Sequence, residues 1–280
     1  MNLVKALRRT TIMQYSQPKT YELVGKTFHL IMDSGYDLAL NFISEEICRW
    51  CVDGKAPVDS AYHCVKADDT TYFMSVRVSD KENHMYVLET EQRLVTKQTL
   101  TMGLNPKMPY MLKSEFDFGA IDVEGYRLPF KRHFFSVDSL GTHVQWRWGM
   151  DHYTKHAYLE SDYYRITWDD AGATADSFDE SCEIQPATDE PARYVKIKEH
   201  MFLFSLIESN NERFLKENQK FRSNNLTLLQ NFDRGFQTGY GFGTSLRDGE
   251  FAPMFLPLTA FGKPDDIPES FLNYDNPYTV

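Results

Sequence analysis

Long apolar runs, basic clusters and a framework of paired cysteines are all missing from this sequence. No stretch approaches the roughly 18 consecutive apolar residues of a membrane-spanning helix, and the first residues lack the apolar core of a signal peptide. The formal net charge is −10, and no stripe of Lys and Arg is present that could follow a phosphate backbone. We therefore expect no membrane partner, no nucleic-acid partner and a cytoplasmic location.

Cysteine is scarce, with four residues in a chain of 280. That number is too small for a disulfide framework, so reduced and packed thiols are expected. Cys48 and Cys51 have the spacing of a redox pair, but thioredoxin chemistry places that pair at a helix N-terminus. Here the two residues fall in a β-like run, in which residues three apart face opposite sides.

Aromatic residues are abundant, with 16 Tyr and 20 Phe making up most of the 14% aromatic fraction. Such residues favour strands and pockets for flat or apolar ligands. From Val24 onward, apolar and polar residues alternate, and short polar turns separate the segments. The predicted strands of the first part are residues 27–32, 37–43, 47–52, 61–67, 71–79, 84–89 and 94–102. Short strands without intervening helices indicate an antiparallel sandwich or closed barrel.

Segments in the first half of the sequence are similar to segments in the second half. Residues 65–79 align without a gap on 195–209, residues 38–50 align on 156–168, and 23–25 align on 139–141. Residues 84–93 can be laid on 225–234 if about eleven extra residues are allowed in the second copy. These matches favour a duplication. We predict an all-β fold of two tandem lipocalin-like antiparallel barrels; the alternative is one wide barrel that pools the strands of both halves.

The predicted organisation has five parts. Residues 1–20 form a short N-terminal helix or arm, 21–103 the first barrel, 104–139 a proline-containing connector, 140–244 the second barrel and 245–280 a tail packed on the barrels. Residues 210–222 have helical spacing and are interpreted either as a flap at one barrel mouth or as an ordinary surface excursion.

Comparison of the two copies points to a candidate site in the second. Leu38, Leu40 and Phe42 set the inward face of one strand, and this alignment gives them the partners His156, Tyr158 and Glu160. Burying an unpaired imidazole or carboxylate is unfavourable, so such groups are expected to pair with one another, with water or with a ligand.

The candidate catalytic residues are a general base or acid, His156 or Glu208, and two donors to a developing oxyanion, Tyr158 and Tyr164. The candidate substrate-binding residues are Arg147, Trp146, Trp148, Tyr194, Phe204 and Phe202.

Other chemistries are disfavoured. His152 and His156 are four residues apart, which on a strand spans about 13 Å, too far for one metal ion. The glycines at 239, 241 and 243 open no helix that could cradle a phosphate. No nucleophile-elbow serine is visible. We expect neither a metal nor a cofactor.

Several segments together resemble the MoaF-like proteins, named for molybdenum-cofactor biosynthesis protein F. They are residues 23–28 with 33–35, residues 116–122 (Phe-Asp-Phe-Gly-Ala-Ile-Asp), and residues 153–164 followed by 194–197. The resemblance covers about residues 20–245, with the closest likeness in the second half. It implies two lipocalin-like domains. Phe118 stands where the family tends to carry a histidine.

The resemblance also extends, at the level of fold, to phenolic acid decarboxylases, which use a similar set of tyrosines with an Arg and a Glu. The prediction is a cofactor-independent lyase or isomerase for a small aromatic, phenolic or polyketide-like substrate. Decarboxylation, dehydration, double-bond migration and cyclisation are all open. The alternatives are a non-catalytic carrier of a hydrophobic ligand and a structural, dimer-forming module; a homodimer is compatible with each.

Overall fold

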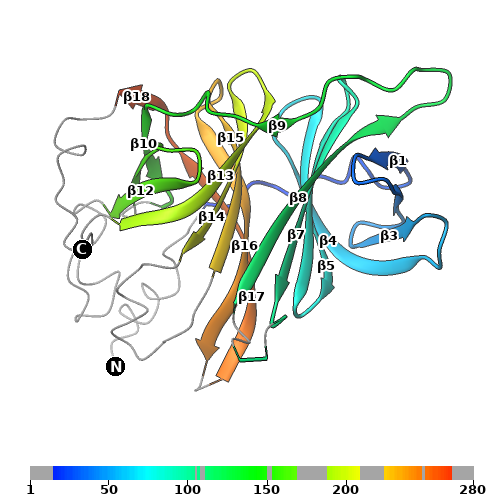
Figure 1. The fold of residues 1–280 in the computed structure, drawn as a ribbon, viewed down its shortest axis with the longest axis horizontal. Coiled ribbons are helices and arrows are strands. Elements are labelled where there is room, and N and C mark those ends of the chain that lie inside the picture. Colours follow the sequence, from blue (N-terminus) through cyan, green and yellow to red (C-terminus); the bar gives the residue numbers. More distant parts are fainter. Residues whose placement is uncertain are drawn as a thin grey trace. The chain divides into compact units, whose positions relative to one another are not determined.

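The computed structural model describes residues 15–104, 106–107, 111–149, 153–168, 188–208, 224–247 and 250–266. Within these ranges the regular elements are antiparallel β-strands, and they divide into two compact units (Figure 1). In the described part, no helix is long and apolar enough to cross a membrane. The all-β prediction is confirmed.

The first unit is a closed barrel of eight strands in sequence order. Its strands are β1 (Thr27–Met32), β2 (Asp37–Phe42), β3 (Ile47–Val52), β4 (Val58–Lys66), β5 (Thr71–Ser79), β6 (Glu82–Glu89), β7 (Leu94–Met102) and β8 (Leu112–Asp122). The barrel closes where β1 pairs with β8, for example Leu30 with Ile121. Closure leaves no exposed sheet edge.

Strand alternation fills this barrel. Leu38, Leu40 and Phe42 of β2 point inward and belong to one core cluster with Met74 of β5 and Tyr86 of β6. All five side chains are buried. A barrel of eight strands is about wide enough for its own side chains to fill, so this interior also fixes its diameter.

The second unit is a further ring of eight strands. They are β10 (Thr142–Arg147), β11 (Tyr153–Ala157), β12 (Tyr163–Trp168), β13 (Thr188–Lys198), β14 (Met201–Glu208), β15 (Asn224–Asn231), β16 (Phe236–Arg247) and β17 (Glu250–Phe261). The ring closes at β10, which pairs with β11 on one side and with β17 on the other. Two short strands are added: β18 (Pro264–Asp266) pairs with β10, and β9 (Phe134–Phe135) pairs with β13.

The two barrels repeat the same local geometry. Gly25 and Gly141 have φ angles of 80° and 81°. The Gly25 N–H donates to the carbonyl of Phe42 at 2.8 Å, and the Gly141 N–H donates to the carbonyl of Tyr158 at 2.8 Å. This repeated hydrogen bond makes Tyr158 the counterpart of Phe42.

The strand registers agree. Leu40 pairs with Phe28 and Trp50 in the first barrel, and His156 pairs with Val144 and Ile166 in the second. His156 is therefore the counterpart of Leu40, two positions from the partner that sequence alignment assigned. Because side chains alternate with a period of two, the correction leaves His156 and Tyr158 on the inward face.

Other predicted segments need correction. The expected connector, residues 104–139, contains β8, which closes the first barrel, and the expected tail, residues 245–280, contains β17 and β18. A single wide barrel is excluded, since each ring closes on itself. The expected flap at 210–222 and residues 1–14 of the N-terminal arm lie outside the described residues; Tyr15 and Gln17 bond to Trp148 and Thr259 of the second barrel.

Candidate functional site

The interior of the second barrel is a cluster of aromatic rings around one imidazole. The ring of His156 lies 5.0 Å from Tyr164, 5.9 Å from Phe204 and 6.3 Å from Tyr158, measured between centroids. Phe204 also stacks on Tyr194 at 5.4 Å. His156 is 2% exposed and the four rings 0 to 1%. These edge-to-face, tilted and stacked contacts fix the rings relative to one another.

A short chain of hydrogen bonds holds His156. Trp148 Nε1 can only donate, and it donates to Thr154 Oγ1 at 2.8 Å. The Thr154 hydroxyl can then give its own proton to His156 Nε2, which lies 3.0 Å away. We therefore assign the imidazole proton to Nδ1, an atom that is buried and has no hydrogen-bond partner among the described residues.

Burial keeps this imidazole neutral. Desolvation, with a smaller contribution from the charge of His143, lowers the pKa of His156 to about 3. At neutral pH the side chain therefore presents an N–H donor to the barrel interior and carries no charge.

Tyr158 offers a second donor. Its hydroxyl oxygen accepts from Trp146 Nε1 at 3.1 Å and from Gln230 Nε2 at 2.6 Å. Both lone pairs are thereby used, which leaves the phenolic proton to be donated. Burial raises the pKa of Tyr158, opposed by the hydrogen bonds from Trp146 and Gln230, so the phenol stays protonated.

The polar chain continues to Gln237, whose Oε1 accepts from Gln230 Nε2 at 3.1 Å. Gln230 Oε1 and Gln237 Nε2 are buried without a partner among the described residues. An unsatisfied buried polar atom costs about 1 to 3 kcal/mol, so its presence in a barrel interior needs an explanation.

The first barrel carries apolar residues at the matching positions. The registers place His156 and Tyr158 where the first barrel has Leu40 and Phe42. The remaining counterparts are Thr154 for Leu38, Tyr164 for Cys48, Tyr194 for Cys64, Phe204 for Met74, Gln230 for Leu88 and Gln237 for Val95. A barrel of this fold thus closes without these polar groups, and they are specific to the second copy.

Most of the residues predicted for the site lie together. Trp146, Trp148, Tyr158, Tyr164, Tyr194 and Phe204 belong to one buried cluster that surrounds His156. The Tyr194 hydroxyl is engaged by the backbone, since it donates to the carbonyl of Tyr163 at 3.1 Å. Phe202 is buried, and its ring lies 5.7 Å from that of Phe232.

Arg147 is placed differently from the prediction. Trp146 and Trp148 take the inward positions of this segment, so Arg147 lies on the outer face, where it is exposed. Its Nε donates to the carbonyl of Gly149, and its guanidinium lies 5.8 Å from the ring centroid of Tyr153. The side chain of Glu208 lies outside the described part of the chain, although its backbone ends β14.

Sequence comparison missed Glu190. This carboxylate is 1% exposed and shares the inward row of β13 with Ala192 and Tyr194. Its Cα pairs with that of Tyr164 across β12 and β13. The alternation Thr188, Glu190, Ala192 could have revealed it, but residues 169–194 lie between the aligned segments 156–168 and 195–209 and were not compared with the first copy. An acid of this kind can accept or return a proton inside the barrel.

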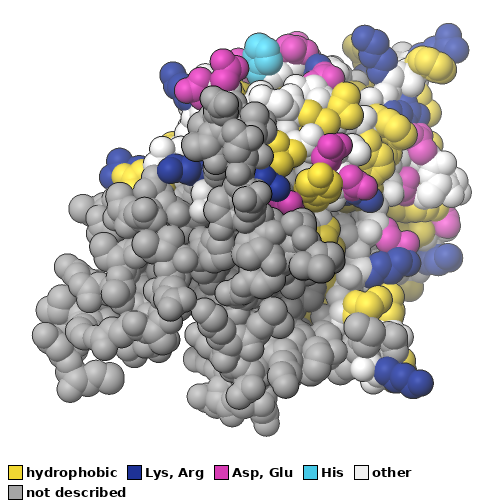
Figure 2. Space-filling model, turned by 60° about the vertical axis from the view of Figure 1, so that its left-hand side comes forward, with side chains coloured by type: hydrophobic (Ala, Val, Ile, Leu, Met, Phe, Trp, Pro, Cys, Tyr) yellow, Lys and Arg dark blue, Asp and Glu magenta, His cyan; other side chains and the backbone are white. Residues whose placement is uncertain are grey.

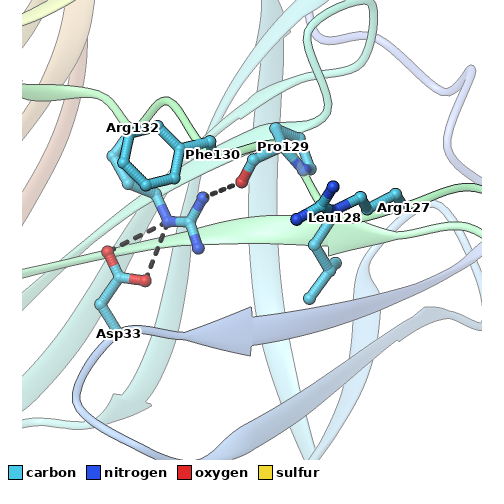
Figure 3. Close-up of a pocket in the computed structure, with 6 residues that line it drawn as sticks. All are labelled: Asp33, Arg127, Leu128, Pro129, Phe130 and Arg132. Carbon is cyan, nitrogen blue, oxygen red and sulfur yellow. Dashed lines mark hydrogen bonds and ion pairs between the residues drawn. The ribbon is translucent and has the colours of Figure 1, made fainter.

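A surface pocket of about 590 Å³ lies on the first unit, lined by residues 127–130, Arg132 and Asp33 (Figure 3). Arg132 Nε donates to both carboxylate oxygens of Asp33, at 2.8 and 3.1 Å, and the guanidinium also donates to the carbonyl of Pro129. These bonds fasten the segment after β8 to the β1–β2 turn. Acidic, basic and apolar side chains are interspersed on the described face in Figure 2.

Comparison with known families concerns the first barrel. Residues 9–102 match the family model of the MoaF N-terminal domain. The first barrel is therefore similar to the MoaF N-terminal domain, in agreement with the family resemblance of the sequence. The match spans β1 to β7, whereas the likeness seen in the sequence was closest in the second half. None of the curated proteins matches the chain. The family likeness therefore rests on the barrel that lacks the His156 cluster.

Proposed function

We propose that this protein is a cofactor-independent lyase or isomerase that acts by acid/base chemistry in its second barrel. The substrate class is a small aromatic, phenolic or polyketide-like molecule of the kind made in secondary metabolism. The observation that carries the proposal is the pair of unused donors, His156 Nδ1–H and the Tyr158 hydroxyl, in an aromatic interior whose counterpart in the first barrel is apolar.

The two donors suit one oxygen atom of a bound carbonyl or phenol. Both donors are neutral and buried, so they stabilise the bound molecule most strongly when negative charge develops on that oxygen. Loss of CO2 or migration of a double bond next to a carbonyl passes an electron pair to the oxygen. A buried site with two positioned donors lowers the barrier for such steps.

The reaction also needs a group that moves a proton. Glu190, inward on β13 and paired with Tyr164 in the ladder, is the described carboxylate that fits this role. Glu208 ends the neighbouring strand β14 and remains a second candidate. In each reaction type considered, the carboxylate takes or returns a proton at carbon while His156 and Tyr158 hold the oxygen.

A non-catalytic carrier is the alternative, and one observation favours it. Burial lowers the pKa of His156 to about 3 and raises the pKa of Tyr158, so neither group titrates near neutral pH. Neutral donors among aromatic rings are sufficient to orient a ligand without changing it.

Turnover assays on the unaltered protein and on matched variants distinguish the enzyme from the carrier. Aromatic acids and conjugated ketones are incubated with the protein in D2O, and NMR follows loss of CO2, bond migration and exchange of carbon-bound hydrogen. We expect Tyr158→Phe and His156→Leu to lower turnover by about 100-fold, the usual effect of removing one oxyanion donor.

Tyr62→Phe is the matched control. It deletes a phenol that donates to the carbonyl of Ser44 at 3.0 Å in the first barrel, and it should leave turnover unchanged. If no compound is turned over while one binds tightly, and its affinity is insensitive to Glu208→Gln and His156→Ala, the enzyme is ruled out in favour of the carrier.

A further inference from the structure

One end of the first barrel carries a different polar group, at the β1–β2 hairpin. Tyr36 and Trp50 pack against the barrel core, and Lys97 and Thr99 take inward positions on β7, yet all four side chains are only partly buried. An inward side chain that keeps contact with solvent must reach it through the barrel opening. This end is therefore accessible from outside.

Lys97 supplies a positive charge inside this opening. Its ammonium donates to the Tyr36 hydroxyl at 3.2 Å and lies 5.4 Å from the centre of that ring. Among the described residues, no carboxylate lies within 4.0 Å of it. Asp117, opposite Lys97 in the ladder, accepts instead from the Ser34 hydroxyl and from the Phe118 N–H. Two N–H donors of the ammonium therefore have no acceptor among the described residues.

The wall beside Lys97 is aromatic and rigid. Trp50 meets the ring of His84 at 5.5 Å between centroids. Both nitrogens of that imidazole are engaged, Nδ1 by the Tyr86 hydroxyl at 3.3 Å and Nε2 by a Glu82 carboxylate oxygen at 2.7 Å. Tyr86 is also the ladder partner of Lys97. The imidazole and the Glu82 carboxylate thus hydrogen-bond each other, and the charges of Glu82 and Asp117 act on the ammonium only from beyond ion-pair distance.

A neutral donor lies on the same inward row. Thr101 Oγ1 is buried and has no hydrogen-bond partner in the described part of the chain. The described part of the second barrel does not repeat these side chains: the registers place Gly239 at the position of Lys97, Ile166 at that of Trp50 and Leu226 at that of His84.

We propose that the open end of the first barrel is a separate binding site for a small planar organic anion, namely an aromatic or conjugated carboxylate. The carboxylate lies against Lys97 and the conjugated body lies beside Trp50. The spare donors of an ammonium pair best with a carboxylate, since charge-assisted hydrogen bonds are about twice as strong as neutral ones. The site does not depend on the reaction proposed for the second barrel.

Cinnamate and the uncharged cinnamamide form a suitable probe pair, measured by calorimetry and by tryptophan fluorescence. The chain has four tryptophans, and Trp50 is the only one that belongs to the first barrel. Quenching of its fluorescence therefore reports on this site. We expect cinnamate to bind about tenfold or more tightly than cinnamamide. Trp50→Phe should remove the quenching while calorimetric binding persists.

Lys97→Met should weaken cinnamate about tenfold or more and leave cinnamamide unchanged, and Lys97→Arg should keep most of the affinity. Lys26→Met is the matched control: it removes an equal charge just before β1, at the opposite end of the barrel, and should change nothing. If Lys97→Met does not fold, the comparison of the two probes on the unaltered protein still decides.

The proposal is overturned if cinnamate binds no better than cinnamamide, or if Lys97→Met retains full affinity. It is equally overturned if the quenching by cinnamate survives in Trp50→Phe, because the ligand would then lie beside tryptophans of the second barrel.

Discussion

At the scale of single residues, the buried imidazole of His156 ties stability to pH. An unfolded imidazole titrates near about 6.5, whereas burial lowers the pKa of His156 in the folded protein to about 3. Between these values the unfolded chain binds a proton that the folded chain does not. The free energy of unfolding therefore falls as the pH falls from about 6.5 toward 3, by up to about 1.4 kcal/mol per pH unit.

Replacing this imidazole should flatten that dependence. We expect His156→Leu, which installs the first-barrel counterpart Leu40, to reduce the slope between pH 6 and pH 4 by about 1 kcal/mol per unit. Urea unfolding at a series of pH values measures it. Tyr62→Phe, which loses a buried hydrogen bond but no group that titrates in this range, should keep the original slope. Equal slopes for His156→Leu and the unaltered protein would contradict the assigned burial.

Residue-level prediction from the sequence succeeded where strand parity was enough. The predicted inward positions of His156, Tyr158 and Tyr164 agree with their burial in the second barrel. The alignment was shifted by two residues, but a shift of two keeps each side chain on the same face of the strand. The predicted inward position of Arg147 was wrong for the converse reason. Arg147 was chosen for its charge, although its place in the strand alternation puts its side chain on the outer face. Gln230 was missed because the third alignment was shifted by one position, which reverses the face, and Gln237 lies beyond the end of that alignment.

At the scale of elements, β8 shows why one strand of the first barrel escaped detection. Its outward residues Phe116 and Phe118 are apolar, whereas Glu115 and Asp117 take inward positions at the open end. The usual pattern of apolar-in and polar-out is thus inverted there, and the segment resembled a connector. The other first-barrel strands follow the normal alternation, and β1, β3, β5 and β7 were predicted with their observed bounds.

In the second barrel, β17 was hidden by prolines. Pro253 and Pro257 cannot donate a ladder hydrogen bond, and proline usually argues against a strand. On one side β17 pairs fully with β16, but on the other it meets β10 only at Phe261 with Arg147. Among the described residues, much of that second side has no strand partner, so the strand tolerates proline there.

Gly262 separates β17 from β18 at a point where the backbone comes close to β10. A Cβ atom there would lie 2.5 Å from the backbone oxygen of Gln145 and 3.0 Å from the ring of Trp146. We expect Gly262→Ala to force β18 away from β10 and to lower the free energy of unfolding by about 2 kcal/mol or more.

Gly54→Ala provides the comparison for this element. Gly54 has a φ of 64° with nothing within 4 Å of an added Cβ, so alanine there meets only backbone strain, about 1 kcal/mol. Urea midpoints for the two variants measure the difference. A smaller loss for Gly262→Ala than for Gly54→Ala would show that the close approach to β10 does not constrain this strand.

At the scale of the whole molecule, the duplication explains how one fold carries two different interiors. The shared turn at Gly25 and Gly141 and the matching registers keep both barrels closed. The polar residues inside the two barrels nevertheless differ. In the second barrel His156 and Tyr158 take the positions of Leu40 and Phe42, and in the first barrel Lys97 takes the position that Gly239 has in the second. Homodimer formation and a cytoplasmic location remain predictions at this scale.

Nitrogen NMR of protein labelled with ¹⁵N-histidine reports the protonation state of His156 directly, and His156→Leu identifies its signal. We expect a neutral ring that is protonated at Nδ1 and stays neutral at pH 5, and an Nδ1–H signal that shifts when an aromatic or conjugated carbonyl compound binds. A ring that is charged at pH 5, or protonated at Nε2, or whose signal does not shift with a ligand bound in the second barrel, would show that His156 is not a neutral Nδ1–H donor to the ligand.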